Sequence, residues 1–135
     1  PVTIGAPLCS GQPNSAGAGA TVRPSGSLVP FENELILDVT GLPPASAGYF
    51  VMSDTTGQTP VGQGVLCLGA PTLRFSLHVV VASSAGWGQF RPDLSNLPQG
   101  ATVTPGSTWH FQMWYRDANP GSVSNLSEAQ SFTFR

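Results

Sequence analysis

The stretch that decides the fold class is TWHFQMWYR, residues 108–116, because its side chains alternate strictly between two kinds. In an extended strand, successive side chains point to opposite faces. One face then carries the core-type residues Trp109, Phe111, Met113 and Tyr115. The other face carries His110, Gln112, Trp114 and Arg116. A period of two over this length predicts a long β-strand with one face in a hydrophobic core.

Similar short segments recur along the chain and are separated by Gly- and Pro-rich turns. The predicted strands are 33–40, 47–53, 65–68, 73–81, 86–93, 108–116 and 129–134. In 73–81 the alternation predicts Leu77, Val79 and Val81 inward, and Arg74 and His78 outward. Seven or eight short strands with regular turns indicate an antiparallel β-sandwich, immunoglobulin- or jelly-roll-like, and a barrel fits the same pattern. We expect one module over 1–135, with 1–20 as an extended lead-in.

Composition excludes several classes of protein. The 135 residues include 16 Gly and 13 Pro, which break helices too often for a helical bundle. Charged residues make up 9%, lysine is absent, and the net charge is -2, so nucleic acid is not an expected partner. No apolar run is long enough for a membrane helix, so we expect no membrane insertion.

The two cysteines, Cys9 and Cys67, point to the compartment. One disulfide between them is the simplest interpretation and predicts a secreted or cell-surface protein. Closing a loop of this length would stabilise the fold by about 4 kcal/mol. Two buried free thiols are the alternative, and the absence of a C-x-x-C motif speaks against structural zinc. Because the chain starts at Pro1 without a leader, we expect it to be part of a larger multidomain protein.

Trp114 among polar neighbours suggests a binding surface. Strand 86–93 likewise turns Trp87, Gln89 and Arg91 to one side. If these strands are neighbours, one solvated face collects the candidate ligand-binding residues Trp87, Trp114, Arg91, Arg116, Gln112 and His110. Sugar rings stack on flat aromatic rings while Arg and Gln donate to their hydroxyls. The alternative is that loops cover both tryptophans and that arginines stack on them for stability.

Catalytic and metal sites are not indicated. None of the seven carboxylates forms a recognisable pair for glycoside hydrolysis, and no nucleophile motif is present. His78 and His110 could meet across strands and hold a metal, but surface or hydrogen-bonded histidines are commoner. Loop oxygens of four residues could bind calcium, although capping of backbone turns explains them better. These are Asp117, Asn119, Asn125 and Glu128. We therefore predict no enzyme, cofactor or metal.

Several runs resemble a β-rich module at the C-terminal ends of large exported proteins of environmental bacteria. They are CSGQPNS from Cys9, GLPP from Gly41, GYFVMS from Gly48, LCLG from Leu66, DLSNLP from Asp93, TWHFQMWYRD from Thr108, NPGS from Asn119 and SNLS from Ser124. The resemblance implies export, a non-catalytic accessory role and Cys9–Cys67 pairing. The resemblance implies no particular ligand and no binding residue.

The functional hypothesis is a secreted, non-catalytic accessory module that binds polysaccharide through an exposed aromatic sheet face. The alternative is a structural or adhesion module that assembles with protein at the cell surface through its sheet edges. The extended N-terminal segment could then pair with a neighbouring chain.

Overall fold

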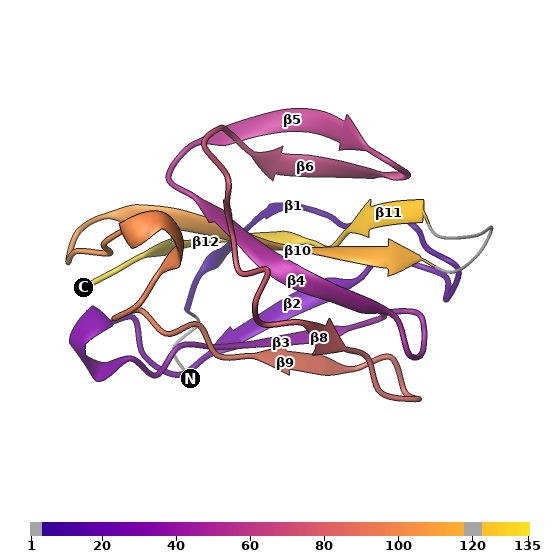
Figure 1. Cartoon of the computed structure of the whole chain (residues 1–135), viewed down its shortest axis with the longest axis horizontal. Coiled ribbons are helices and arrows are strands. Elements are labelled where there is room, and N and C mark those ends of the chain that lie inside the picture. Colours follow the sequence, from indigo (N-terminus) through magenta and orange to yellow (C-terminus); the bar gives the residue numbers. More distant parts are fainter. Residues whose placement is uncertain (1–3, 118–122) are drawn as a thin grey trace.

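The computed structural model describes residues 4–117 and 123–135, which form twelve β-strands and two short 3-10 turns (Figure 1). The strand pairs are antiparallel, so the predicted all-β antiparallel sandwich is confirmed. Seven or eight strands were expected. The larger number arises because a predicted strand is divided and because short segments at 6–9, 21–25, 56–61 and 123–126 also pair. None of the described helices is long and apolar enough to cross a membrane.

The largest sheet is built around β10 (Thr108–Asp117), the strand predicted at 108–116. Its path runs β1 (Ala6–Cys9), β12 (Ala129–Thr133), β10, β4 (Ala47–Ser53) and β7 (Leu73–Arg74). Two further strands join it, β11 (Val123–Leu126) on β10 and β8 (Val80–Val81) on β4. The lead-in is therefore partly a sheet strand, since β1 pairs with β12.

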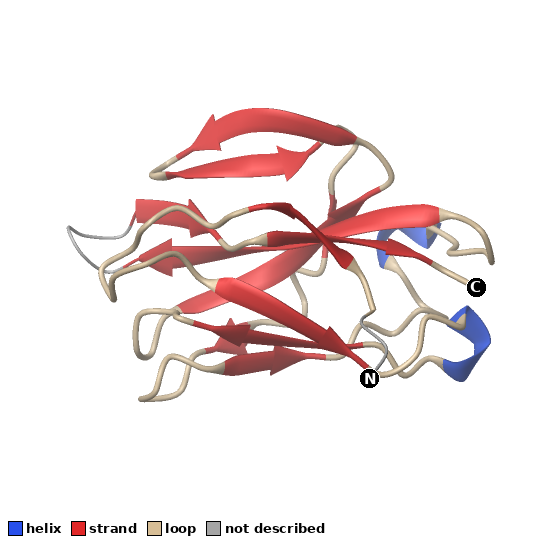
Figure 2. Cartoon of the chain, turned by 180° about the vertical axis from the view of Figure 1, so that it is seen from behind, coloured by secondary structure: helices blue, strands red, loops and turns tan. Residues whose placement is uncertain are grey.

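A smaller sheet packs against the inner face of the large one (Figure 2). It has the order β2 (Thr21–Ser25), β3 (Ile36–Thr40) and β9 (Gly88–Phe90). Its Leu37 and Val39 meet Phe50, Phe111 and the other inward side chains of the large sheet in one core. This burial of large apolar side chains is the main stabilising term of such a fold.

The hairpin of β5 (Thr56–Val61) and β6 (Gly64–Leu68) forms a third layer, seen above the large sheet in Figure 1. It covers part of the outer face that the sequence suggested would meet solvent. Val51 on β4 is completely buried there, in a second small cluster with Cys67 and Leu68. The Cys9–Cys67 disulfide is present and joins this hairpin to β1, as predicted.

The predicted strand 73–81 is wrong as one continuous element. After β7 the chain turns at 76–78, where the His78 N–H donates to the Phe75 carbonyl at 3.0 Å. It re-enters the sheet one residue out of phase, so Val80 points inward at 6% exposure. Leu77, Val79 and Val81, expected in the core, are 92%, 59% and 61% exposed. One local turn therefore places aliphatic side chains on the surface, since a shift of one residue reverses every face.

Candidate functional site

The strand order separates the two candidate tryptophans. Trp114 lies on β10 in the middle of the large sheet, whereas Trp87 immediately precedes β9 of the small sheet. Trp87 is 45% exposed and its neighbour Gly88 is buried, so its ring lies on the outer side of the opposite layer. The single face that was to hold both rings is therefore wrong, because the two strands are not neighbours.

The local alternation around Trp87 is nevertheless as predicted. Gln89 and Arg91 are exposed on the same side, and the Gln89 amide donates to Asp38 at 2.9 Å. The residues facing outward from β2 and β3 on this side are polar or aliphatic. They are Thr21, Arg23, Ser25, Ile36, Asp38 and Thr40. Trp87 thus has no second aromatic ring beside it on these strands, and stacking there would depend on one indole.

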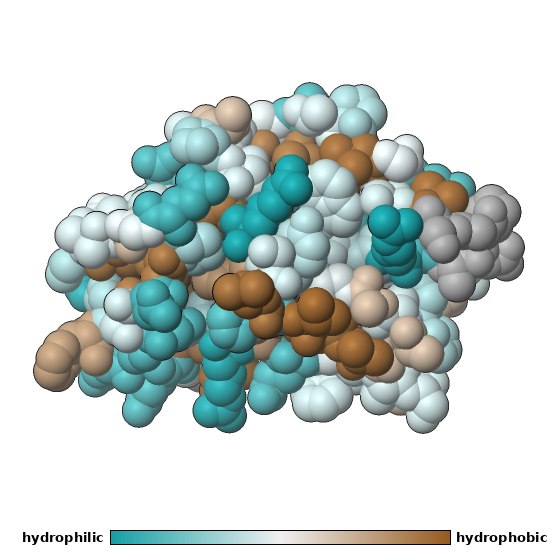
Figure 3. All heavy atoms as spheres, viewed as in Figure 1, coloured by the Kyte–Doolittle hydropathy of each residue, from teal (hydrophilic) through white to brown (hydrophobic). Residues whose placement is uncertain are grey.

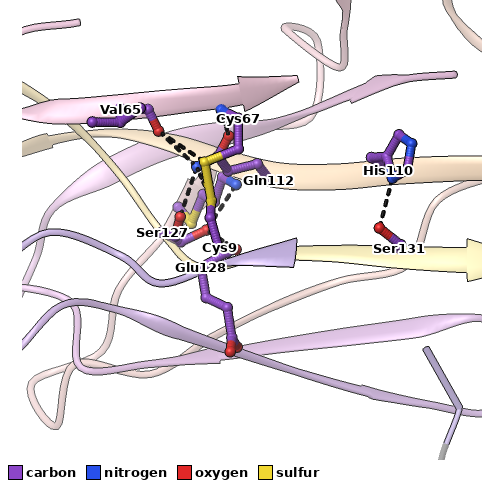
Figure 4. The surroundings of a disulfide bond; sticks show 9 residues. Cys9, Val65, Cys67, His110, Gln112, Ser127, Glu128 and Ser131 are labelled. Atoms are coloured by element: carbon purple, nitrogen blue, oxygen red, sulfur yellow. Dashed lines mark hydrogen bonds between the residues drawn. A yellow bond between two sulfur atoms is a disulfide. The ribbon is translucent and has the colours of Figure 1, made fainter. Parts of the chain in front are cut away.

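Gln112, expected to meet ligand, is completely buried under the hairpin (Figure 4). Its Oε1 accepts from the Cys67 N–H at 3.0 Å. Its Nε2 donates to the Val65 carbonyl at 3.0 Å and the Ser127 carbonyl at 2.8 Å. The prediction that Gln112 binds ligand is corrected: the side chain ties β6 to β10, because β6 lies over this part of the sheet. The sequence carried no signal for that cover.

His110 is also withdrawn from solvent, at 8% exposure. One ring nitrogen, Nδ1, is 2.6 Å from the Ser131 hydroxyl of β12 (Figure 4). Burial lowers the pKa of His110 below its ordinary value, and the charge of Asp54 offsets part of that effect. A nearly buried ring bonded within its own sheet cannot readily meet a polymer, so His110 also leaves the candidate site.

The depressed pKa of His110 predicts a pH-dependent stability. The unfolded ring takes up a proton at its ordinary pKa, while the folded ring resists it, so this contribution is present above pH 6.5 and falls below it. Thermal unfolding of wild type and His110→Gln should be compared between pH 7.5 and 5. We expect the midpoint of the wild type to fall more over this range. Equal decreases in the two proteins would contradict the assignment.

Trp114 is half-buried at the border of the region that the hairpin covers, where Tyr49 packs against the cluster beneath the hairpin. Trp114 lies directly opposite Tyr49 on β4. The β4–β8 register pairs Ala47 with Val81, which places Val79 beside Tyr49. We call this surface the Trp114 face, comprising Tyr49, Arg74, Val79, Val81, Trp114 and Arg116. Tyr49 was missed, although it alternates with the buried Phe50 in a segment correctly predicted as a strand.

Arg74 lies over the Trp114 ring. Its Cζ is 5.3 Å from the ring centroid, within the range of a cation–π contact. Arg74 projects from β7, where it pairs with Val51, and reaches across β4 to the indole. Trp114 is partly buried as a result. Of the alternative, that both tryptophans are covered and carry stacked arginines, the arginine contact is confirmed for Trp114, whereas Trp87 is 45% exposed.

Two hollows adjoin this Arg74–Trp114 contact. One, of about 270 Å³, contains Trp114 and Tyr49; it is lined by Ala47, Gly48, Tyr49, Val79, Trp114, Tyr115, Arg116 and Ser124. The other, of about 480 Å³, contains Arg74; it is lined by Thr72, Arg74, Phe75, Ser76, Leu77, His78, Asn96, Leu97, Pro98 and Gln99. Figure 3 shows a brown hydrophobic band on this side of the molecule, over the region of β8. Of the exposed aliphatic side chains, Leu77 lines the larger hollow and Val79 the smaller one.

Three of the four candidate calcium ligands make hydrogen bonds within the fold. Asp117 is buried and its Oδ2 accepts from the Ser15 N–H at 2.7 Å. The Asn125 amide donates to the Pro13 carbonyl at 3.1 Å, and Glu128 Oε1 accepts from the Val22 N–H at 2.9 Å. Asn119 lies outside the described residues. Within 4–117 and 123–135 no group of three or more His, Cys, Asp or Glu could hold a metal ion.

Comparisons with known proteins add no relative. No family model, curated protein or solved structure matches the chain. The resemblance to a C-terminal module of exported proteins therefore remains a prediction, as do export and the multidomain context. The functional conclusion has to come from the Trp114 face itself.

Proposed function

We propose that this chain is a non-catalytic, secreted or cell-surface accessory module that binds polysaccharide on the Trp114 face. One observation carries the proposal. Trp114 and Tyr49 are half-buried register partners on β10 and β4, and both line a hollow of about 270 Å³. This differs from the original hypothesis, because Trp87, Arg91, Gln112 and His110 no longer belong to the site.

The chemistry of the hollow suits a sugar ring. Aromatic side chains offer flat apolar surface to the C–H face of a sugar, and each also carries a polar group at its edge. Arg116 and Ser124 line the same hollow and supply donors for hydroxyls. Arg74 covers part of the Trp114 ring, so its guanidinium would contact the ligand together with the indole. The disulfide supports an oxidising compartment.

Replacing the indole tests the proposal. Trp114→Ala should lower affinity for the bound polysaccharide at least about 10-fold, because loss of one stacked aromatic at a binding hot spot costs more than about 1.4 kcal/mol. Retention in native gels containing soluble polysaccharides, followed by calorimetry, measures the change. Tyr49→Ala should weaken the same binding, and circular dichroism checks that each variant folds.

Trp87→Ala is the matched control, since Trp87 lies on the opposite layer. It should leave affinity unchanged. If Trp87→Ala abolished retention while Trp114→Ala did not, the site would lie on the small sheet and the proposal would be wrong. If no polysaccharide were retained by the wild-type protein, the function would be wrong.

A second candidate function rests on the aliphatic band. Leu77, Val79 and Val81 are exposed; Val79 lines the hollow of Trp114 and Leu77 lines the larger one. Exposed aliphatic side chains near Trp, Tyr and Arg are typical of a protein-docking surface. Contact through sheet edges, as first suggested, is less favoured. Prolines interrupt three edge strands: Pro7 in β1, Pro24 in β2 and Pro60 in β5. Concentration-dependent assembly in sedimentation, lost in Val79→Ser, would favour this function over polysaccharide binding.

A further inference from the structure

We infer that the polysaccharide held on the Trp114 face is an anionic one, bearing carboxylate or sulfate groups along its chain. This inference rests on the proposed function and specifies its ligand class. Its basis is the distribution of charge around the two hollows.

The hollows are cationic on an acidic protein. The chain has seven acidic residues and five arginines, for a net charge of -2. Two of those arginines line the hollows, Arg74 the larger and Arg116 the smaller. Among the described residues that line them there is no Asp or Glu. An anionic ligand in either hollow would therefore meet an arginine and no acidic side chain of the lining.

The nearest acidic side chains along the chain are directed elsewhere. Asp117 follows Arg116, but it is buried on the other face of β10 and bonded to Ser15. Asp93 does not line either hollow; hydrogen bonds from Ser95 and Asn33, and to a smaller extent the nearby His78, lower its pKa. Neither carboxylate lines a hollow, so the acidic groups nearest in sequence are not part of the two linings.

The Arg74 guanidinium is positioned before any ligand arrives. Its contact with the Trp114 ring, at 5.3 Å, restrains a long side chain that would otherwise lose rotamer freedom on binding. A guanidinium presents a planar fork of N–H donors that matches the two oxygens of a carboxylate or sulfate. An acidic sugar could thus stack against the aromatic pair while its charged group meets Arg74.

The arrangement also favours a polymer over a single sugar. Arg74 lines the larger hollow and Trp114 the smaller one, so the contact between these two side chains links the two linings. An extended chain crossing this contact would fill both hollows and bring separate acidic groups to Arg74 and Arg116. A monosaccharide would reach only one hollow and one arginine.

The test compares one polysaccharide in a charged form and in an uncharged form. Binding of the whole chain to polygalacturonate and to its fully methyl-esterified form is measured by calorimetry at low and high salt. We expect the charged form to bind at least about 10-fold more tightly, with affinity falling as salt rises. Arg74→Gln should remove most of this difference, and Arg116→Gln part of it. The same comparison between a sulfated galactan and its desulfated form tests whether sulfate can serve as the anionic group.

Arg91→Gln is the matched control, because it removes the same charge from the opposite layer. It should leave the preference intact. Equal losses for Arg74→Gln and Arg91→Gln would show general attraction to a polyanion and overturn the inference. Binding of neutral polysaccharide that Trp114→Ala abolishes and Arg74→Gln spares would overturn the anionic ligand while keeping the proposed function. Binding to neither charge form and to no neutral polysaccharide would overturn both.

Discussion

Removing the Cys9–Cys67 disulfide is expected to lower the free energy of unfolding by about 4 kcal/mol. The bond spans 58 residues, so its loss frees a long loop in the unfolded chain. It also joins β1 to the β5–β6 hairpin, which would lose its covalent attachment to the large sheet. The Cys9→Ala/Cys67→Ala double variant and urea unfolding of both proteins measure the effect.

A reductant supplies the control for this prediction. Wild-type protein in dithiothreitol should unfold at the urea concentration of the double variant, whereas the variant itself should not respond to the reductant. Hydrogen exchange should then show faster exchange in β5 and β6 than in β10. A decrease below about 1 kcal/mol in both experiments would mean that the hairpin is held by its other contacts alone.

Replacing Gln112 with leucine should destabilise the fold by about 3 kcal/mol or more. The substitution keeps the approximate volume but removes three bonds, leaving the Cys67 N–H and the carbonyls of Val65 and Ser127 without their partner. Each buried backbone group left unsatisfied costs about 1–3 kcal/mol. Chemical denaturation measures the loss, and it should appear although Gln112 lies on the strand face first assigned to ligand.

Gln89→Leu is the matched control, since Gln89 is exposed and its amide donates to the carboxylate of Asp38 on the surface. Its cost should stay within about 0.5 kcal/mol, as for most surface substitutions. Similar losses at positions 89 and 112 would contradict the structural role of Gln112. A folded Gln112→Leu variant that keeps wild-type stability but loses polysaccharide binding would restore the original assignment.

The alternation of side chains within one strand was sufficient to predict which of its faces lies in the core. Residues 108–116 form a strand with Phe111, Met113 and Tyr115 in the core, because a period of two leaves one direction for the apolar side chains. The same alternation correctly predicted that Trp87 is exposed and that Phe90 is buried. Two cysteines in a chain of this composition were sufficient to predict the disulfide.

The candidate site was predicted only in part. Trp114 and Arg116 keep their place, but the residues that now accompany them come from other elements. Arg74 reaches the indole from β7, and Val79 is exposed because of the turn at 76–78. No pattern within 108–116 could indicate either neighbour, since both depend on which strands lie beside β10.

The sequence by itself therefore determined the all-β class, the faces of strands such as 108–116 and the covalent cross-link, but not the division of 73–81 or the short strands that were not predicted. Only the tertiary structure decided which outward-facing residues reach solvent. The hairpin buries Gln112, and the strand order places Trp87 on the layer opposite Trp114. Both outcomes follow from long-range packing, in which a distant segment covers or separates residues that one strand would present together.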